Sequence, residues 1–470
     1  MSEQAVRGVH AISRTTRLTA SIVACALFMQ TLDSTVISTA LPAMARAFHA
    51  DAVGMSVALT SYLISLAAFI PASGWMADRY GTRQVFRAAI AVFTLGSVLC
   101  GRADTLGFLV AARVLQGMGG AMMVPVGRLV LLRSVAKTEL VAAMAWLTIP
   151  ALLGPVIGPP LGGLIVTYAS WRWIFDINVP IGLLGIALVT WFVHDVREPR
   201  PVGLDWRGLV LSGLALAGLM LAVEIGARGL VSLGAALTIG AGALTCAALY
   251  GWHARRHPAP LLDLSLMRVP TFAVSVYAGS LFRIGIGAMP FLLPLMLQIG
   301  FGDSAARSGM VTFAGSAGAL VMKPVATRVI GRLGFRRTLL WNGLIGALTL
   351  GACGAFRPAW PLAAIYAVLL IGGFFRSLQF TAFNTIAYAD LSRAQMSAAT
   401  SLYSTLQQVS LTFGVVAGAI ALQAAMTLRG HAVPSTGDFG AAFYVVAGFC
   451  LLSVPIALAL RRDAGASLIG

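Results

Sequence analysis

One carboxylate, Asp33, lies in an otherwise apolar run from Phe28 to Met44, and no cationic residue occurs within twelve positions of it on either side. A charged side chain in such a run is costly to hold inside a membrane, so it usually pairs with another charge or serves ions, protons or a substrate. We therefore predict that Asp33 handles protons or contacts a substrate. The alternative is a fixed ion pair that only holds two helices together.

A cation and an amide lie in a second apolar run, where Arg113 precedes Gln116 by about one helical turn. At about 1.5 Å per residue, Asp33 and Arg113 both lie roughly 10–14 Å below the same membrane boundary if their runs are antiparallel helices. Pairing, directly or through Gln116, favours the charged carboxylate, whereas desolvation favours the neutral one. Because an arginine stays protonated, Asp33 is the predicted proton carrier of this region.

The C-terminal part of the chain has no acid deep in an apolar run, but it carries Arg283, Arg376 and Gln379 in such runs. Counting Asp33 against the three arginines, Arg113 included, leaves an excess of two positive charges. This excess favours an anionic or zwitterionic solute over a lipophilic cation. The alternative is that the arginines snorkel to the membrane surface or pack between helices.

The elements that position these residues are predicted to be membrane helices. The chain is 58% hydrophobic and 10% charged, with a mean hydropathy of +0.87. Apolar stretches long enough to cross a bilayer recur along its whole length. We count fourteen, at 18–42, 55–77, 84–103, 106–132, 139–168, 174–194, 207–227, 230–252, 272–300, 304–325, 338–356, 360–385, 396–424 and 438–460.

The net charge of +17 could suggest a nucleic-acid partner, but its distribution argues against one. With the N-terminus inside, 22 of the 33 Lys and Arg residues fall on cytoplasmic tails and loops and 7 on outer loops. This asymmetry follows the positive-inside rule, so the basic excess records membrane topology. It also predicts an even number of spans, with both termini in the cytoplasm.

Three segments of the first half recur in order in the second half. An offset of 253 residues superposes Gly81 on Gly334 within two short basic loops, and an offset of 263 lays Arg113–Gln116 over Arg376–Gln379. A Leu-Pro pair recurs at an offset of 252. Ordered matches of this kind indicate duplication. We predict an N-terminal six-helix bundle at 1–195, a linker with two extra transmembrane helices at 196–260, and a C-terminal six-helix bundle at 261–470.

Five motifs follow one another along the chain. They are Leu32-Asp33-Ser34-Thr35-Val36 with Ala40-Leu41-Pro42, the loop Gly74–Arg83, Arg113-Val-Leu-Gln116-Gly117-Met-Gly119-Gly120, Gly154-Pro155-Val-Ile-Gly158-Pro-Pro-Leu-Gly162-Gly163, and Trp171–Gly182. Together they resemble the major facilitator superfamily, and within it the fourteen-span drug:proton antiporters of the EmrB/QacA type, nearest to the MdtD-like members. The resemblance implies an all-α polytopic membrane protein with the major facilitator fold: two six-helix bundles plus two inserted central helices, fourteen spans in all.

The resemblance also gives roles to the loop and to the fifth span. The loop residues are implied to form a conformational latch between the halves; these are Gly74, Asp78, Arg79, Gly81 and Arg83. The alternative is a plain cytoplasmic loop that is basic for topology alone. The fifth-span residues are implied to form an antiporter hinge that limits leak; these are Gly154, Pro155, Gly158, Gly162 and Gly163. The glycines four apart share one helix face, so ordinary close packing is the alternative.

The predicted function is a proton-coupled secondary active efflux transporter, an antiporter that exports small molecules or drugs. Export of an organic anion or an anionic metal chelate is the main alternative, and an uncoupled facilitator and a membrane sensor are further ones. An enzyme is not predicted, because the sequence has no paired carboxylates, no nucleophile with a base and no Walker sequence.

The predicted partners are the lipid bilayer, protons and a small-molecule substrate. Transport is expected to be driven by the proton gradient without a cofactor. No metal site and no nucleic-acid partner are predicted. The expected location is the cytoplasmic (inner) membrane of a bacterium, with a multi-pass monomer as the working unit.

Overall fold

The computed structural model describes residues 13–51, 54–134, 140–193, 195, 203, 205–227, 232–258, 260–392 and 395–465. These residues form helices and connecting turns, with no strand among them. Eleven of their helices are long and apolar enough to cross a membrane. Helix α6 and the two arms of α13 supply the other three predicted spans. The predicted all-α, many-span fold class is therefore confirmed, and the chain is a multi-pass membrane protein.

The first bundle is built from the helices before residue 195. Its elements are α1 Arg14–Ala47, α2 Ser56–Phe69, η1 Ile70–Ala72, α3 Ser73–Tyr80, α4 Thr82–Gly101, α5 Leu106–Ser134, α6 Leu140–Tyr168, α7 Trp173–Asp176 and α8 Asn178–Phe192. Helix α1 begins where the Ser13 side chain accepts a hydrogen bond from the Thr16 amide, which satisfies one of the free donors of the first turn. Helix α1 packs on α6, and α5 packs on both α2 and α4.

The second bundle begins after a short turn of helix, η2 Leu264–Arg268. Its elements are α11 Pro270–Gly287, α12 Met289–Leu295, η3 Met296–Gly300, α13 Ala305–Gly354, α14 Leu362–Ile386, α15 Met396–Arg429 and α16 Thr436–Ala457. The predicted span 272–300 is divided between α11, α12 and a single π-helical turn, η3. Two predicted spans, 304–325 and 338–356, are the two arms of α13, which are separated by a kink at Gly334.

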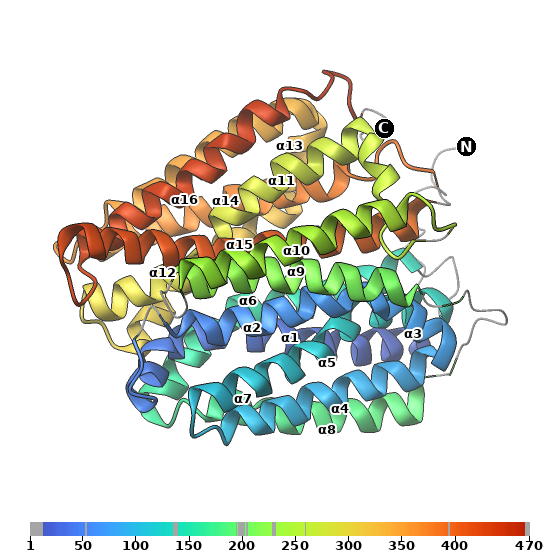
Figure 1. The fold of residues 1–470 in the computed structure, drawn as a ribbon, viewed down its shortest axis with the longest axis horizontal. Coiled ribbons are helices and arrows are strands. Elements are labelled where there is room, and N and C mark those ends of the chain that lie inside the picture. The colour runs from blue at the N-terminus through green and yellow to red at the C-terminus, as the bar shows by residue number, and fades with distance from the viewer. Residues whose placement is uncertain are drawn as a thin grey trace, which may run out of the picture.

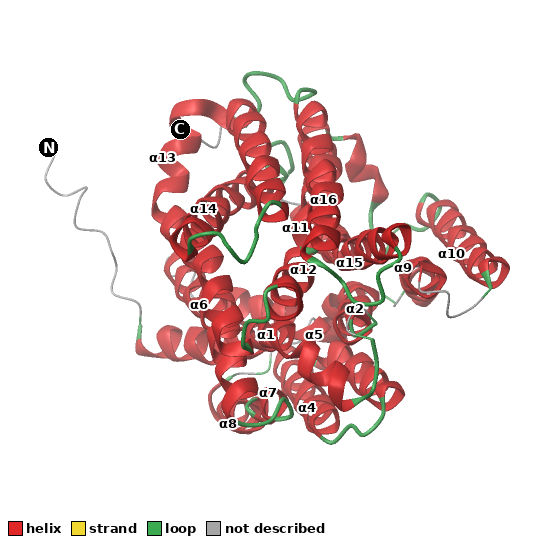
Figure 2. Ribbon diagram, turned by 90° about the vertical axis from the view of Figure 1, so that its left-hand side faces the viewer, coloured by secondary structure: helices red, strands yellow, loops and turns green. Residues whose placement is uncertain are grey.

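Two further helices connect the bundles. They are α9 Trp206–Ala227 and α10 Leu233–Ala254. Helix α9 packs on α2 of the first bundle and on α15 of the second, whereas α10 packs mainly on α9 (Figure 2). The inserted pair therefore lies along the seam between the bundles, with α10 at the periphery.

The backbone repeats the same break at the two loops that the sequence paired. Gly81 has φ +93° and separates α3 from α4, and Gly334 has φ +73° and divides α13. A residue with a Cβ rarely adopts such angles, so glycine is required at both positions. The offset of 253 residues thus corresponds to one conformational feature made twice.

The bundles share an extensive buried core toward one end of the molecule, and a small cluster of Ala67, Met220 and Val409 joins them farther along α2. Leu41 and Met44, near the Ala47 end of α1, belong to one buried cluster with Phe291 of α12. Toward the Arg14 end of α1, the buried apolar side chains of the first bundle form a cluster of their own. Figure 1 agrees, because α11 and α16 rise away from α1 and α2 toward the side where both chain ends lie. The two bundles are therefore joined at the Ala47 end and diverge at the Arg14 end.

Candidate functional site

Asp33 lies in the middle of α1, where it is 3% exposed and accepts hydrogen bonds from three side chains. The guanidinium of Arg113 on α5 donates to Oδ2 at 2.7 Å. The amides of Gln116 and Asn178 donate to Oδ1 at 2.8 and 2.9 Å. All three contacts are donors, which is the arrangement that suits an ionised carboxylate. The structure thus brings together the acid, the base and the amide that the sequence placed at one depth.

Two of the residues around the carboxylate were not selected from the sequence as site residues. Ser97 on α4 accepts hydrogen bonds from both Gln116 and Asn178, at 2.8 and 2.9 Å. Both Ser97 and Asn178 are buried. In the sequence, the one indication that these residues belong to the site is that each is a polar residue inside an apolar span. Serine and asparagine are common in such spans, so this indication is weak. The network joins α1, α4, α5 and α8.

Arg113 is fully buried and is held from several sides. Its Nε donates to the Ala58 carbonyl at 2.9 Å, and its guanidinium carbon lies 4.3 Å from the centre of the Tyr62 ring. The Phe175 ring lies at 5.9 Å. Such ring faces attract a cation and exclude water. Because every one of these contacts comes from the first bundle, the charge pair belongs to that bundle alone in this conformation.

The opposite face of α1 packs on the glycine stripe of α6. A Cβ added at Gly154 would lie 2.1 Å from Oγ1 of Thr31, and one added at Gly158 would lie 2.0 Å from Oγ1 of Thr35. Gly162 meets Thr39 in the same way. Asp33 lies two residues from Thr31 and Thr35, or roughly 200° around the helix. The stripe therefore lets α1 and α6 approach closely, while the carboxylate points toward α4, α5 and α8.

A second face of α6 meets the other bundle. A Cβ on Gly163 would lie 2.3 Å from the Ala305 carbonyl oxygen at the start of α13, and a Cβ on Gly309 would lie 2.1 Å from the Pro159 carbonyl oxygen. Backbone contacts this close require glycine at both positions. The fifth-span motif thus lies on the seam at the Ala47 end. The side chain of Pro155, which belongs to the predicted hinge, lies outside the described residues.

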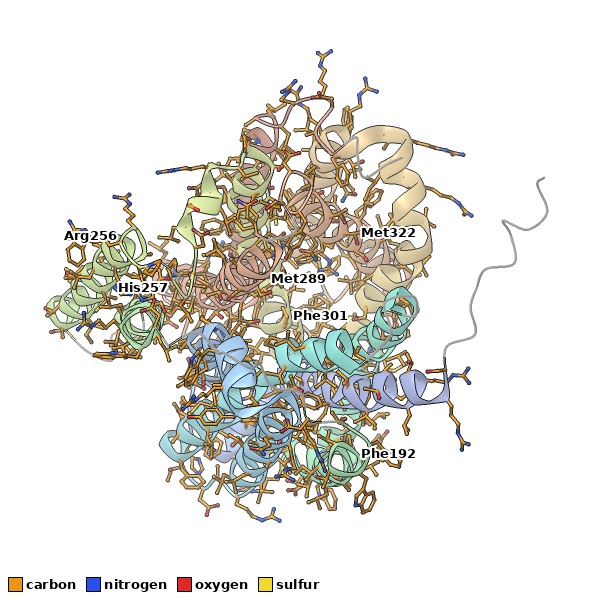
Figure 3. The ribbon with its side chains drawn as sticks, turned by 90° about the vertical axis from the view of Figure 1, so that its right-hand side faces the viewer. Phe192, Arg256, His257, Met289, Phe301 and Met322 are labelled. Atoms are coloured by element: carbon orange, nitrogen blue, oxygen red, sulfur yellow. The ribbon has the colours of Figure 1, made fainter. Side chains whose placement is uncertain are left out.

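The second bundle holds Arg283 and Arg376, the two arginines deep in its spans, without a carboxylate partner among the described residues. Arg283 is buried and donates to Oδ1 of Asn384 at 2.9 Å and to the Tyr403 hydroxyl at 2.6 Å. Arg376 is partly buried and contacts the sulfur of Met289, a residue near the centre of the molecule in Figure 3. The two arginines do not share a partner.

Gln379, the counterpart of Gln116, binds the backbone and an amide. Its Nε2 donates to the Leu339 carbonyl at 3.1 Å, and its Oε1 accepts from Asn342 at 3.0 Å. The structure therefore does not bring Gln379 and Arg376 into one network as it does Gln116 and Arg113.

The predicted latch loop packs within the first bundle. Arg83 donates to the Thr190 carbonyl near the end of α8, and Arg79 is exposed. A Cβ on Gly81 would collide with the carboxylate of Asp195. Gly74 has open space around it, and the side chain of Asp78 lies outside the described residues. Arg83 and Gly81 thus join this loop to α8 and to Asp195, which follows α8.

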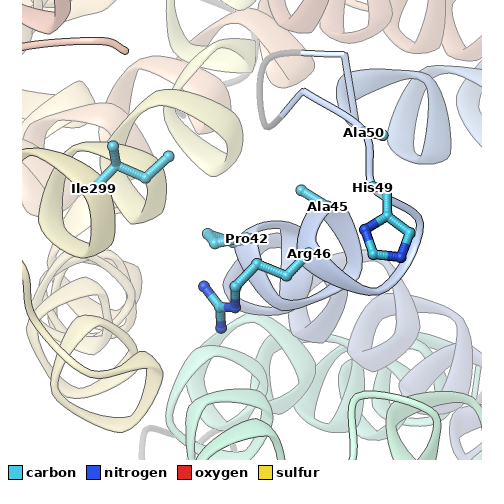
Figure 4. A pocket seen from close by; sticks show the side chains of 6 residues that line it. All are labelled: Pro42, Ala45, Arg46, His49, Ala50 and Ile299. Atoms are coloured by element: carbon cyan, nitrogen blue, oxygen red, sulfur yellow. The ribbon is translucent and has the colours of Figure 1, made fainter.

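A pocket of about 430 Å³ opens at the Ala47 end, between α1 and the η3 turn of the second bundle (Figure 4). Its lining residues are Pro42, Ala45, Arg46, His49, Ala50 and Ile299. Arg46 and His49 place basic side chains in the lining of this pocket. The buried Asp33 network lies farther along α1. The pocket is therefore a feature of the end at which the bundles meet.

Two helical bundles with an internal repeat, joined at one end and holding an intramembrane acid–base pair, define a secondary transporter. A family model described as Major Facilitator Superfamily matches residues 23–415. The chain belongs to the Major Facilitator Superfamily, a family of transporters rather than enzymes.

Bacterial relatives and solved structures agree with this assignment. A protein from Pectobacterium carotovorum subsp. carotovorum (strain PC1) is 39% identical over 421 residues, which are 89% of each chain. One from Serratia proteamaculans (strain 568) is 40% identical over 403 residues, covering 84% of this chain and 82% of that one. Both are assigned by name as multidrug resistance protein MdtD.

Among solved structures, the POT family transporter PepTSo superposes with a TM-score of 0.70 at 14% identity, covering 94% of this chain and 97% of that one. The human organic anion transporter MFSD10 superposes with a TM-score of 0.64 at 13% identity, covering 94% and 99%. At these identities the likeness concerns the fold alone.

Proposed function

We propose that the chain is a proton-coupled antiporter that exports small molecules across the cytoplasmic membrane of a bacterium. The observation that carries the proposal is the buried Asp33 carboxylate, paired with Arg113 at 2.7 Å inside a transporter bundle. An intramembrane carboxylate is a functional residue by default, because the bilayer makes it expensive. The names of the bacterial relatives support export of drugs as the direction and purpose of transport.

The network explains how such a carboxylate could exchange a proton. In this conformation Asp33 accepts hydrogen bonds from three donors and has almost no contact with solvent. A shift of α1 against α5 would lengthen the contact to Arg113 and admit water. Protonation would then neutralise Asp33 and leave Arg113 to its carbonyl and aromatic contacts. Alternation between these arrangements couples one proton to one conformational change.

The glycine stripe of α6 suits the required movement. Three glycines of α6 face three threonines of α1, so only the threonines contribute side chains to this contact. Small residues let two membrane helices slide with little change in packing. The second face of α6 meets α13 of the other bundle, so a movement at this seam is transmitted to both bundles.

The membrane orientation that we propose places both chain ends in the cytoplasm. Most of the basic residues then lie on cytoplasmic loops, in agreement with the positive-inside rule. The Arg14 end of α1, where the bundles diverge, faces the cytoplasm, and the joined Ala47 end faces outward. This is the conformation in which an exporter accepts its substrate from inside. We expect a monomer that uses the proton gradient and no cofactor.

An organic anion or an anionic chelate is the second candidate substrate. Arg283 and Arg376 have no ion pair among the described residues, although both lie in the membrane-spanning part of the second bundle. A guanidinium binds a carboxylate or phosphate through two parallel hydrogen bonds, which an ammonium cannot copy. An anion bound near these arginines would offset their charge.

The test is transport in everted membrane vesicles with an imposed pH gradient. Asp33→Asn is expected to abolish gradient-driven uptake of substrate, because the amide cannot carry a proton at this position. The panel includes quaternary ammonium compounds and carboxylate-bearing solutes, so one series of measurements addresses coupling and substrate charge.

Ser34→Ala is the matched control, because Ser34 neighbours Asp33 and, among the described residues, its hydroxyl bonds to the Thr31 carbonyl alone. It should transport as the wild type does. Undiminished gradient-driven transport in a correctly inserted Asp33→Asn variant would show that the proton carrier lies elsewhere.

A further inference from the structure

A cluster of three potential metal ligands lies at the Arg14 end of the inserted helix pair, away from the Asp33 network. Asp205 immediately precedes α9, His253 lies in the last turn of α10, and His257 follows four residues later. One donor atom from each of these three residues lies within 4.8 Å of the other two. Figure 3 shows His257 beside Arg256 on the peripheral helix pair, far from Met289 at the centre. None of these three residues belongs to the hydrogen-bond network around Asp33.

The carboxylate of this cluster is buried and fixed in place. The Asp205 side chain is 4% exposed, and its Oδ1 accepts a hydrogen bond from the Gly208 amide at 2.8 Å. Its Oδ2 accepts from the Leu261 amide at 3.3 Å. Burial would raise the pKa of Asp205, but the hydrogen bonds from Gly208, His253 and Leu261 outweigh it and lower the pKa. These hydrogen bonds fix the position of the carboxylate.

The two imidazoles come from one end of α10 and lie over one another. Their ring centres are 5.1 Å apart with an angle of 35° between the planes. Nε2 of His253 lies 2.6 Å from Oδ1 of Asp205. The hydroxyl of Tyr250 bonds to both the amide and the carbonyl of Leu262, at 2.6 and 2.9 Å, and this fixes the loop after the histidines. The Tyr250 contacts thus hold Leu262 against α10 near the two histidines.

We propose that Asp205, His253 and His257 bind a divalent transition-metal ion of the zinc class. Two imidazoles and one carboxylate form a ligand set that suits zinc, with a fourth position left for water. Zinc binds nitrogen and carboxylate oxygen at about 2.0–2.2 Å, so the ion would separate the direct His253–Asp205 contact by a fraction of an ångström. The ion would then connect the start of α9 to the end of α10.

A metal ion bound here would stabilise the segment that joins the two bundles. Helix α9 packs on α2 and α15, one from each bundle, and Asp205 also receives the Leu261 amide from the stretch that leads into the second bundle. The sequence did not predict the site, because Asp205 lies 48 residues before His253. Two histidines four apart are a weak signal until the fold adds the carboxylate. The proposal does not depend on the direction or coupling of transport.

The test measures zinc binding to the purified full-length protein in detergent after removal of metal with a chelator. The wild type should bind a zinc ion that His253→Ala and His257→Ala bind about tenfold or more weakly. Asp205→Asn keeps a side-chain oxygen for the Gly208 amide but loses the charge, and it should weaken binding as well. Cobalt in place of zinc should give the visible absorption bands of a four-coordinate site in the wild type only.

His431→Ala is the matched control. His431 also pairs with an aspartate, since its Nδ1 lies 2.7 Å from Oδ2 of Asp438, but the described residues offer it no second histidine. Zinc binding should survive this change. Absence of zinc binding by the wild type, or unchanged binding by a folded and monodisperse His257→Ala variant, would overturn the proposal. Because His257 lies beyond the last turn of α10, its removal should leave the fold intact.

Discussion

The first bundle buries a carboxylate against a guanidinium, whereas the second bundle holds two guanidinium groups with no carboxylate paired to either among the described residues. Asp33 and Arg113 neutralise each other at 2.7 Å. Arg283 binds the neutral oxygens of Asn384 and Tyr403 instead, and Arg376 contacts a methionine sulfur. The two bundles therefore share one architecture but differ in their buried charges. The first holds an acid–base pair, and the second holds positive charge that no carboxylate among the described residues offsets.

The difference shows that residues which the sequence pairs between the bundles do not keep the same side-chain partners. Arg113 and Gln116 correspond to Arg376 and Gln379 in the sequence. In the first bundle both residues converge on Asp33, but in the second Gln379 binds Asn342 and a carbonyl. In the first bundle Arg113 also donates directly to Gln116 at 2.6 Å, a contact that Arg376 does not make to Gln379 among the described residues.

Replacing the arginine in each bundle by methionine should give the largest contrast. Arg113→Met would leave the Asp33 carboxylate buried without its ion-pair partner, which costs about 3–5 kcal/mol of stability. Arg376 is not paired with a carboxylate among the described residues, so Arg376→Met leaves no buried charge without its partner. This change should be neutral or stabilising. The measurement is thermal unfolding in detergent, followed by tryptophan fluorescence.

The double variant Asp33→Asn with Arg113→Met sharpens this comparison. Because it removes both charges, it should recover much of the stability that Arg113→Met loses. Equal losses for Arg113→Met and Arg376→Met would refute the idea that the two bundles differ in charge compensation.

The paired glycine breaks should give an intermediate effect. Gly334→Ala would place a Cβ in a left-handed conformation with open space around it, at a cost of roughly 1–2 kcal/mol. Gly81→Ala carries the same strain and also collides with Asp195, so it should be the more destabilising of the two. Gly74→Ala, in a helix with nothing within 4 Å, is the control and should be neutral or slightly stabilising. A Gly81→Ala variant as stable as Gly74→Ala would contradict the assignment.

Charge-conserving changes in the second bundle should have the smallest effect. Arg283→Lys keeps the charge but loses one of its two bonds, to Asn384 or to Tyr403. A lost hydrogen bond of about 0.5–1.5 kcal/mol corresponds to a reduction in transport of roughly two- to tenfold for an anionic substrate. Competition assays with carboxylate-bearing and quaternary ammonium solutes provide the measurement. Normal transport by Arg283→Lys and Arg376→Lys, with better competition by the cations, would reject the anionic substrate and leave the antiporter proposal intact.

Much of the fold followed from the sequence because the signals were long and repeated. Every predicted span corresponds to a described helix or helical arm, since a bilayer helix needs about twenty apolar residues and leaves little freedom in placement. The convergence of Asp33, Arg113 and Gln116 was also predictable, because equal depth on antiparallel helices brings an acid and a base together. The roles of these residues in transport remain predictions.

The sequence alone determined the class of protein, the number and order of its membrane helices and the presence of a costly charge in the first bundle. These properties depend on local composition and periodicity, which each segment carries within itself. Only the tertiary structure decided which helices the Asp33 face of α1 meets, that Ser97 and Asn178 complete its surroundings, and that Asp205 meets His253 and His257. Such contacts depend on how helices rotate and pack against one another, and that rotation is set jointly by residues far apart in the chain.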